Sequence, residues 1–113
     1  MVDSGHIIVY VTVPDKDSGA VIGRIVVEEG LAACCNIIPG LRSIYRWKGR
    51  LCDESEVLCL FKTRAVLFDR LAERIKALHS YECPEIIAVE VSDAFKPYLD
   101  WIDGQTGLKP ASQ

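Results

Sequence analysis

Hydrophobic positions along this chain follow two different periods, and each period predicts a different kind of element. Nearly continuous apolar runs, rich in β-branched residues, predict strands over 7–13, 57–61 and 86–91. Over 68–78, apolar residues recur every three or four positions between charged residues, which predicts an amphipathic helix. A looser helical spacing over 15–30 predicts an earlier helix. The chain is therefore expected to alternate between strands and helices.

The segment between the two predicted helices is expected to form a long β-hairpin. Its first strand starts near Leu31 and runs to Trp47, and Pro39-Gly40 is interpreted as a bulge or kink within it. Residues 48–50, with the sequence Lys-Gly-Arg, provide a turn, and the chain returns over 51–63. No linker or low-complexity tract divides the sequence into two units.

The order of these elements predicts the fold class. Strand, helix, strand, strand, helix, strand is the order of the ferredoxin-like βαββαβ sandwich, an α+β fold with helices on one face of an antiparallel sheet. A short helix over 95–102 is expected to close the fold, and 104–113 is expected to be a frayed tail. The length of 113 residues suits one domain over 1–113, with its core over about 7–103.

The predicted strands are apolar on both faces, whereas a sheet with one wet face normally alternates apolar and polar residues. The run from Val57 to Phe61 shows this, because it contains only valine, leucine, cysteine and phenylalanine. Since both helices are assigned to one face, a partner is needed to cover the other. Self-association is the simplest explanation, and it places Leu58 and Leu60 at the interface. The pattern does not fix the number of subunits.

Composition excludes some classes of function. The formal net charge is −3, so the chain lacks the basic surface that a nucleic-acid binder needs. No apolar run approaches the roughly 20 residues needed to span a bilayer. The cysteines number five, show no CxxC spacing, and follow a first segment without signal-peptide features. We therefore predict a cytoplasmic protein with free thiols and with neither nucleic acid nor membrane as a partner.

The densest group of reactive side chains lies at the end of the amphipathic helix. His79 and Cys83 are four residues apart, and Glu82 and Glu85 add carboxylates nearby. Imidazole, thiolate and carboxylate groups together suit a borderline metal such as copper or zinc, although nothing completes a tetrahedral ligand set. On spacing alone, a helix terminus with His79 near the negative end of the dipole and solvated glutamates explains the segment better.

A second group of candidates is aromatic and basic. Tyr45 and Trp47 fall on the same side of an extended strand, with Arg46 between them. Such residues can clamp an anionic small molecule, but we favour an oligomer interface because the sheet already needs a partner. Lys62 ends an apolar strand and is a candidate for binding a phosphate or carboxylate, although such a lysine more often extends to water.

Features of an enzyme are weak in this sequence. A cysteine nucleophile, Cys34 or Cys83, would need His79 beside it in space, and buried cysteines more often only pack. The sequence contains neither of the common glycine-rich phosphate-binding loops. We therefore predict a protein without catalytic activity.

A set of short motifs runs in order through the chain from about Val9 to Trp101. In order, they are Thr12-Val13-Pro14-Asp15, Leu31-Ala32-Ala33-Cys34, Asn36-Ile37-Ile38-Pro39-Gly40, Ser43 to Gly49, Glu56-Val57, Lys62-Thr63, Tyr81-Glu82, Pro84 to Ile87 and Tyr98 to Trp101. This set closely resembles the CutA family. Of that family's motif His-Pro-Tyr-Glu-x-Pro-Glu, the chain keeps every fixed position except the first proline, where it has Ser80.

The resemblance implies a divalent-cation tolerance protein whose ferredoxin-like subunits assemble as a compact homotrimer, similar in architecture to the PII signalling proteins. It implies sheets packed inside the trimer with helices outside, which agrees with strands that are apolar on both faces. Family members are linked to copper tolerance and metal-ion binding, usually without enzymatic activity.

Two functions therefore remain open at the level of sequence. The first is a trimeric protein that binds copper or another divalent cation, for which the resemblance raises His79 as a ligand, with Cys83 and Glu85 as companions. The second is a PII-like sensor that holds an anionic metabolite in clefts between subunits. The candidate residues of that cleft are Arg46, Trp47, Lys62 and Tyr81.

Overall fold

A four-stranded antiparallel sheet and three α-helices make up the computed structural model, which describes residues 4–107. In chain order, the elements are β1 (His6–Val13), α1 (Lys16–Glu28), β2 (Cys34–Trp47), β3 (Arg50–Arg64), the 3₁₀ turn η1 (Ala65–Leu67), α2 (Phe68–Leu78), β4 (Ile86–Glu90) and α3 (Lys96–Gln105). The predicted α+β order is confirmed.

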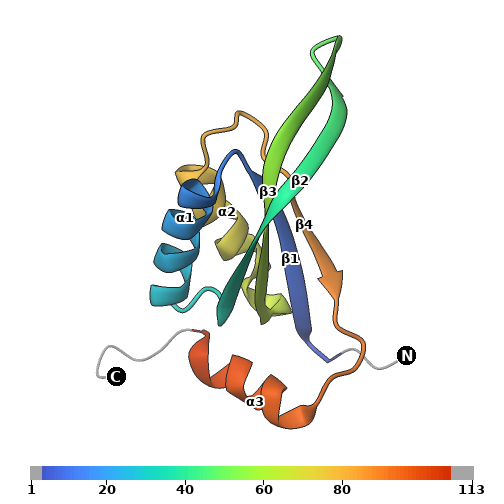
Figure 1. The fold of residues 1–113 in the computed structure, drawn as a ribbon. Helices are drawn as coiled ribbons and strands as arrows, with labels where there is room; N and C mark the ends of the chain where they lie inside the picture. The colour runs from blue at the N-terminus through green and yellow to red at the C-terminus, as the bar shows by residue number, and fades with distance from the viewer. Residues whose placement is uncertain (1–3, 108–113) are drawn as a thin grey trace.

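The strands lie in the order β2-β3-β1-β4, and every neighbouring pair is antiparallel. Helices α1 and α2 lie side by side on one face of the sheet, while α3 lies across its lower end (Figure 1). The upper parts of β2 and β3 extend beyond the other two strands as a projecting hairpin (Figure 1). The hairpin was predicted with a turn at residues 48–50, and the structure places the turn at residues 48 and 49, with β3 already starting at Arg50.

The core lies between the two helices and the face of the sheet that they cover. Val9 and Val11 of β1, Phe61 of β3, and Leu71 and Ile75 of α2 are all completely buried. The strand residues are two apart and the helix residues four apart, so each pair points to one side of its element. The apolar residues that recur at strand and helix spacing in the sequence are therefore the residues that form this core.

Local sequence determines where the helices begin and end. The Asp15 carboxylate accepts a hydrogen bond of 2.7 Å from the backbone N–H of Ser18, and so caps α1. At the other end of α1, the N–H of Leu31 still donates to the carbonyl of Val26. The strand β2 therefore begins at Cys34 and not near Leu31, where it was predicted to start. Helix α2 ends because His79 adopts extended backbone angles, φ −83° and ψ 143°.

The bulge predicted in the hairpin is present at Pro39-Gly40. The pairing of β2 with β3 shifts its register between Ile38 and Leu41. Gly40 has φ +89°, a conformation that side chains other than glycine rarely adopt. The bulge separates the part of β2 that belongs to the sheet from the part that belongs to the projecting hairpin.

The C-terminal segment differs from the prediction of a frayed tail from residue 104. Helix α3 continues to Gln105, and Thr106 is 5% exposed. The Thr106 hydroxyl donates to the carbonyl of Ile102 at 2.8 Å and accepts from the Arg64 guanidinium at 3.1 Å, while Gly107 N–H donates to the Gly30 carbonyl. Residues 104–107 are thus held against β3, and 108–113 lie outside the described residues.

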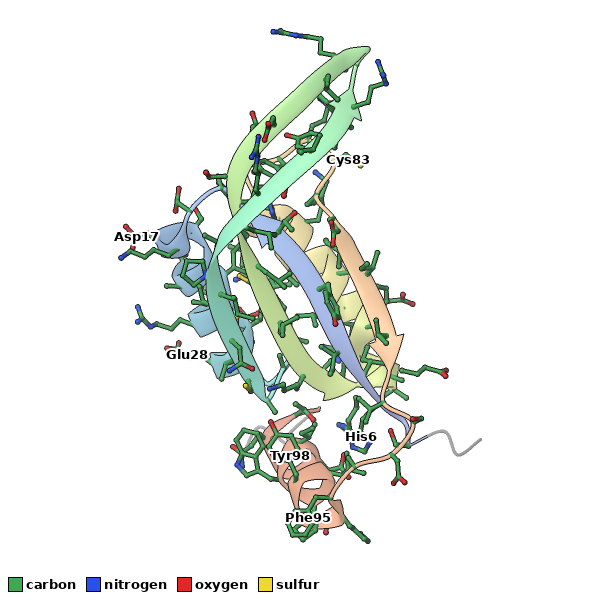
Figure 2. The ribbon with its side chains drawn as sticks, turned by 45° about the vertical axis from the view of Figure 1, so that its right-hand side comes forward. His6, Asp17, Glu28, Cys83, Phe95 and Tyr98 are labelled. Atoms are coloured by element: carbon green, nitrogen blue, oxygen red, sulfur yellow. The ribbon has the colours of Figure 1, made fainter. Side chains whose placement is uncertain are left out.

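The face of the sheet away from α1 and α2 is apolar, as the strands predicted. Ile38, Ile87 and Val89 project from it and are 43%, 52% and 50% exposed. Leu58 and Leu60 lie between them and are half-buried. Figure 2 looks onto this side, where the described part of the chain provides no covering helix.

Within residues 4–107, none of the helices combines the length and the hydrophobicity that a membrane span requires.

Candidate functional site

A cleft of about 700 Å³ lies between the projecting hairpin and the loop that joins α2 to β4. Its walls come from parts of the chain that are far apart in sequence. They include Tyr45 and Trp47 of β2, Glu56 of β3, and Tyr81, Glu82, Cys83 and Glu85 of the loop. Figure 2 shows Cys83 beside the hairpin.

The hairpin contributes its aromatic residues through strand geometry. Tyr45 pairs with Cys52 and Trp47 with Arg50, so both aromatic side chains lie on one face of the ribbon. Leu41, which pairs with Glu56, lies on that same face. The alternation of side chains along β2 and β3 therefore brings the aromatic residues and Glu56 to one wall of the cleft.

His79 anchors the start of the loop. Its Nε2–H donates to the backbone carbonyl of Thr12 at 2.7 Å, and its Nδ1 accepts the backbone N–H of Tyr81 at 3.0 Å. This assignment of the proton to Nε2 follows from the partners, because a carbonyl can only accept and an N–H can only donate. The ring is buried, and both of its nitrogens are occupied.

Tyr81 links the loop to β3. Its hydroxyl donates to the buried carboxylate of Glu56 at 2.7 Å, and its ring lies 4.6 Å from the His79 ring, centre to centre. Burial, followed by the hydrogen bond to Glu56, raises the pKa of Tyr81 above its ordinary value. On the hairpin, the hydrogen bond to Glu54 likewise raises the pKa of Tyr45. Both phenols are therefore neutral at physiological pH.

The charged side chains that line the cleft are all acidic. Glu56, Glu82 and Glu85 contribute carboxylates, and no lysine, arginine or histidine is among the described residues of its wall. The nearest neutralising contact is an exposed ion pair of 3.2 Å between Lys48 and Glu82. Lys48 partly neutralises Glu82, and the carboxylates that remain in excess attract cations and repel anions. The cleft is therefore suited to a positively charged ligand.

The structure brings two of the three predicted metal ligands to this cleft. Cys83 and Glu85 line it, and both are exposed. His79 lies behind it, and ligation by His79 stays a prediction that requires one of its two ring hydrogen bonds to break. Among residues 4–107, no three histidine, cysteine, aspartate or glutamate side chains form a group ready to hold a metal ion.

The residues proposed for an anionic ligand are divided by the structure. Trp47 and Tyr81 line the cleft, whereas Arg46 and Lys62 do not. Arg46 pairs with Leu51 on the opposite face of the ribbon. Lys62 pairs with Cys34, and its ammonium donates to the Asn36 side chain at 2.6 Å. The four residues do not form one binding site within the subunit.

Sequence reasoning missed two members of the site, Thr12 and Glu56. Thr12 contributes a backbone carbonyl, which carries no signal in the sequence, and it meets His79 across 67 positions of the chain. Glu56 gave a usable signal, because it stands directly before the apolar run of β3. The structure shows that this carboxylate is buried. Buried carboxylates need a partner, and Tyr81 supplies it.

Comparison with known proteins identifies the family. The sequence model of the family described as CutA1 divalent ion tolerance protein matches residues 7–105. The chain belongs to the CutA family. The CutA structures from Thermus thermophilus and Xylella fastidiosa superpose with TM-scores of 0.87 and 0.88, at 46% and 40% sequence identity. These alignments cover 90% and 91% of this chain and 99% of each of the other two.

Curated CutA relatives differ in length and in stated location. The divalent-cation tolerance protein CutA of Thermus thermophilus is 47% identical over 100 residues, which cover 88% of this chain and 97% of that protein. The chloroplastic CutA of Arabidopsis thaliana is 42% identical, and the match covers 88% of this chain but 55% of that protein. The chain thus spans about half the length of some relatives. Because one relative is named chloroplastic and another, from Archaeoglobus fulgidus, periplasmic, a cytoplasmic location stays a prediction.

Proposed function

We propose that this CutA-family protein takes part in divalent-cation tolerance by binding a cation, copper(II) in preference to zinc(II), in the acidic cleft. The observation that carries the proposal is the charge of the cleft, which three carboxylates line without a basic residue. The family name supports the same ligand class. The order of metals follows from the Irving–Williams series, in which a given site binds copper(II) more tightly than zinc(II).

Within the cleft, the proposed ligands are Cys83 and Glu85. They are exposed and separated only by Pro84, and a thiolate with a carboxylate suits a borderline metal. Water or a second copy of the chain supplies the remaining positions. His79 has a different role in this proposal, because its two hydrogen bonds fix the loop that carries these ligands.

The alternative of a PII-like sensor for an anionic metabolite has less support. It relies on basic side chains, and Arg46 and Lys62 lie outside the cleft. An anion in the cleft would instead face Glu56, Glu82 and Glu85. We therefore favour the cation over the anion, and a binding protein over an enzyme.

We also propose that the protein assembles as a homotrimer. The apolar face with Leu58, Leu60 and Ile87 is what a subunit interface would cover, since exposed apolar patches of this kind mark contact surfaces. In such an assembly, Tyr45 and Trp47 of the projecting hairpin reach toward a neighbouring subunit.

Copper titration of paired variants tests the proposed site. We expect Cys83→Ser and Glu85→Gln each to weaken copper(II) binding, and binding to weaken as pH falls, because protons compete for both ligands. Glu28→Gln, on the exposed side of α1, and Cys52→Ser on the hairpin are the matched controls and should bind like the parent. Equilibrium dialysis gives the affinities.

The His79→Ala variant separates the two roles of histidine. As an anchor, His79 affects the stability of the loop, and its loss lowers affinity only partly in a folded protein. A complete loss of copper binding in a folded His79→Ala variant, with Cys83→Ser and Glu85→Gln unaffected, would contradict the proposed ligand set and favour His79 as the ligand.

A further inference from the structure

The cleft is larger and more aromatic than a single metal ion requires. Its volume of about 700 Å³ lies within the range of sites for small organic molecules, roughly 300–1,000 Å³. Tyr45, Trp47 and Tyr81 contribute three aromatic side chains to its walls. Copper and zinc are bound by thiolate, imidazole and carboxylate groups, so these rings need another explanation. The faces of aromatic rings attract organic cations, which are also the ligands that an acidic cleft favours.

An ammonium group of the chain itself already lies against two lining residues of the cleft. The Lys48 Nζ is 5.8 Å from the centre of the Trp47 ring and 3.2 Å from the Glu82 carboxylate. Trp47 belongs to the hairpin and Glu82 to the loop, so this ammonium contacts both walls. The Lys48 side chain is 66% exposed, and an ion pair so open to water is weak. An ammonium group from another molecule can therefore take its place.

A second place for an ammonium group is the open oxygen of Glu56, which is only 6% exposed. Its Oε2 accepts from the Tyr81 hydroxyl at 2.7 Å, and within residues 4–107 no donor reaches its Oε1. Among those residues, no fully buried side-chain nitrogen or oxygen lacks a hydrogen bond, so Oε1 keeps some open surface. Because Glu56 lines the cleft, the cleft is the space from which a donor can reach this oxygen. A charged N–H donor makes the strongest hydrogen bond to such a carboxylate.

We propose that the cleft binds an aliphatic polyamine. One ammonium group donates to Oε1 of Glu56, and a second replaces the lysine ammonium between Trp47 and Glu82. The methylene segments between them pack on the tyrosine rings of the walls. Two separate places for positive charge favour a ligand with two or more ammonium groups over a monoamine. This function goes beyond divalent-cation binding, because it uses neither of the proposed metal ligands.

Spermidine is the probe for this proposal, titrated into the full chain, in its native assembly, in a buffer free of metal ions and amines. Isothermal titration calorimetry at low ionic strength should give one spermidine per chain, with n-butylamine, a monoamine, binding more weakly. The sequence holds two tryptophans, so Trp101→Phe leaves Trp47 as the single fluorophore. Its fluorescence should change saturably with spermidine. Because no metal ion is present, the result does not depend on the copper proposal.

Two variants remove the groups that hold the ammonium ions. Trp47→Leu should weaken spermidine binding by at least about five-fold, since it removes the ring that the ammonium faces. Trp101→Leu on α3 is the matched control, because the two tryptophans are 41% and 43% exposed, and it should bind like the parent. Glu56→Gln keeps an acceptor for the Tyr81 hydroxyl but places an amide N–H₂ at the open oxygen, so it should weaken binding as well. Circular dichroism verifies that each variant is folded.

A third variant has an expected effect of the opposite sign. Lys48→Met removes the ammonium that competes for the site and should tighten spermidine binding. Arg50→Met removes one positive charge from the same end of the hairpin and should tighten it less, which separates competition from net charge. The proposal is overturned if the parent shows no saturable binding, if Trp47→Leu and Trp101→Leu bind spermidine equally, or if Lys48→Met has no more effect than Arg50→Met.

Discussion

At the scale of single residues, Tyr81 holds the wall of the cleft together. Its backbone N–H bonds to His79, its ring packs on the same imidazole, and its hydroxyl bonds to Glu56. The Glu56 carboxylate is buried, so it depends on that hydroxyl for a partner. Leaving such a group without a hydrogen bond costs free energy, because water cannot replace the lost partner.

Tyr81→Phe is therefore expected to lower the free energy of unfolding by roughly 1–3 kcal/mol, measured by urea denaturation at neutral pH. Tyr45→Phe is the matched control, since its bond to Glu54 is exposed and water can replace it. Equal losses of unfolding free energy in the two variants would show that the hydrogen bond from Tyr81 to Glu56 stabilises the fold no more than the exposed bond from Tyr45 to Glu54.

The pH dependence of the same residue has a definite sign. Burial and Glu56 raise the pKa of Tyr81, so the folded protein favours the neutral phenol. Its contribution to stability is intact below about pH 10, the ordinary tyrosine value, and is lost as the pH rises above it. As the pH rises through the alkaline range, the free energy of unfolding should fall less steeply in Tyr81→Phe than in the parent.

At the scale of elements, the contact between α1 and the sheet depends on residues without side chains. Gly19 places helix backbone against Cys59 Sγ, with Val13 also within 3.4 Å of a Cβ built there. Glycine weakens a helix relative to alanine by roughly 1 kcal/mol, so close packing is the physical reason for its presence. Helix and sheet are therefore matched in shape at this contact.

Gly19→Ala is expected to destabilise the protein by roughly 1–3 kcal/mol despite the better helix propensity of alanine. In a Cys59→Ala background, the same change should cost much less, because the sulfur that it meets is gone. Gly104→Ala, in α3 with open space around it, should stabilise the protein by about 0.5–1 kcal/mol. Thermal unfolding of these variants gives the coupling energy between positions 19 and 59. An equal loss of stability from Gly19→Ala in the parent and in the Cys59→Ala background would exclude the packing explanation.

The elements that sequence predicted well are those whose signals are local. Helix α2 was predicted from its apolar stripe, and the bulge in β2 from Pro39-Gly40, because period and backbone restriction are properties of neighbouring residues. The ordered end of α3 was missed, since Thr106 is held by Arg64, which lies 42 positions away. The cleft was only half predicted for the same reason, as its walls depend on the register of β2 with β3.

At the scale of the whole molecule, the two faces of the sheet differ in how they are covered. Helices α1 and α2 cover one face (Figure 1), and the described residues leave Ile38, Ile87 and Val89 of the other face open. This asymmetry is what the apolar strands indicated from sequence. It is also the physical basis for the proposed trimer.

Ile87→Glu is expected to convert a trimer into monomers, because burying an unpaired carboxylate between subunits costs several kcal/mol. The subunit itself should still fold, since Ile87 is half exposed within it, whereas Leu58→Glu should impair folding as well. Val66→Glu, on η1 and exposed, is the control and should leave assembly unchanged. Analytical ultracentrifugation is the measurement, and a folded monomer of the parent chain at micromolar concentration would disprove the proposed assembly.

The irregularity at Pro39-Gly40 has a further consequence for solubility. β2 lies at the edge of the sheet, and an edge strand of 14 residues is a template on which strands of other chains can add to form cross-β fibres. Proline has no N–H to offer, and the shifted register breaks the row of donors and acceptors near its middle. The bulge that sets the hairpin apart from the sheet therefore also divides the open edge into two short stretches, each a poor seed for a fibre.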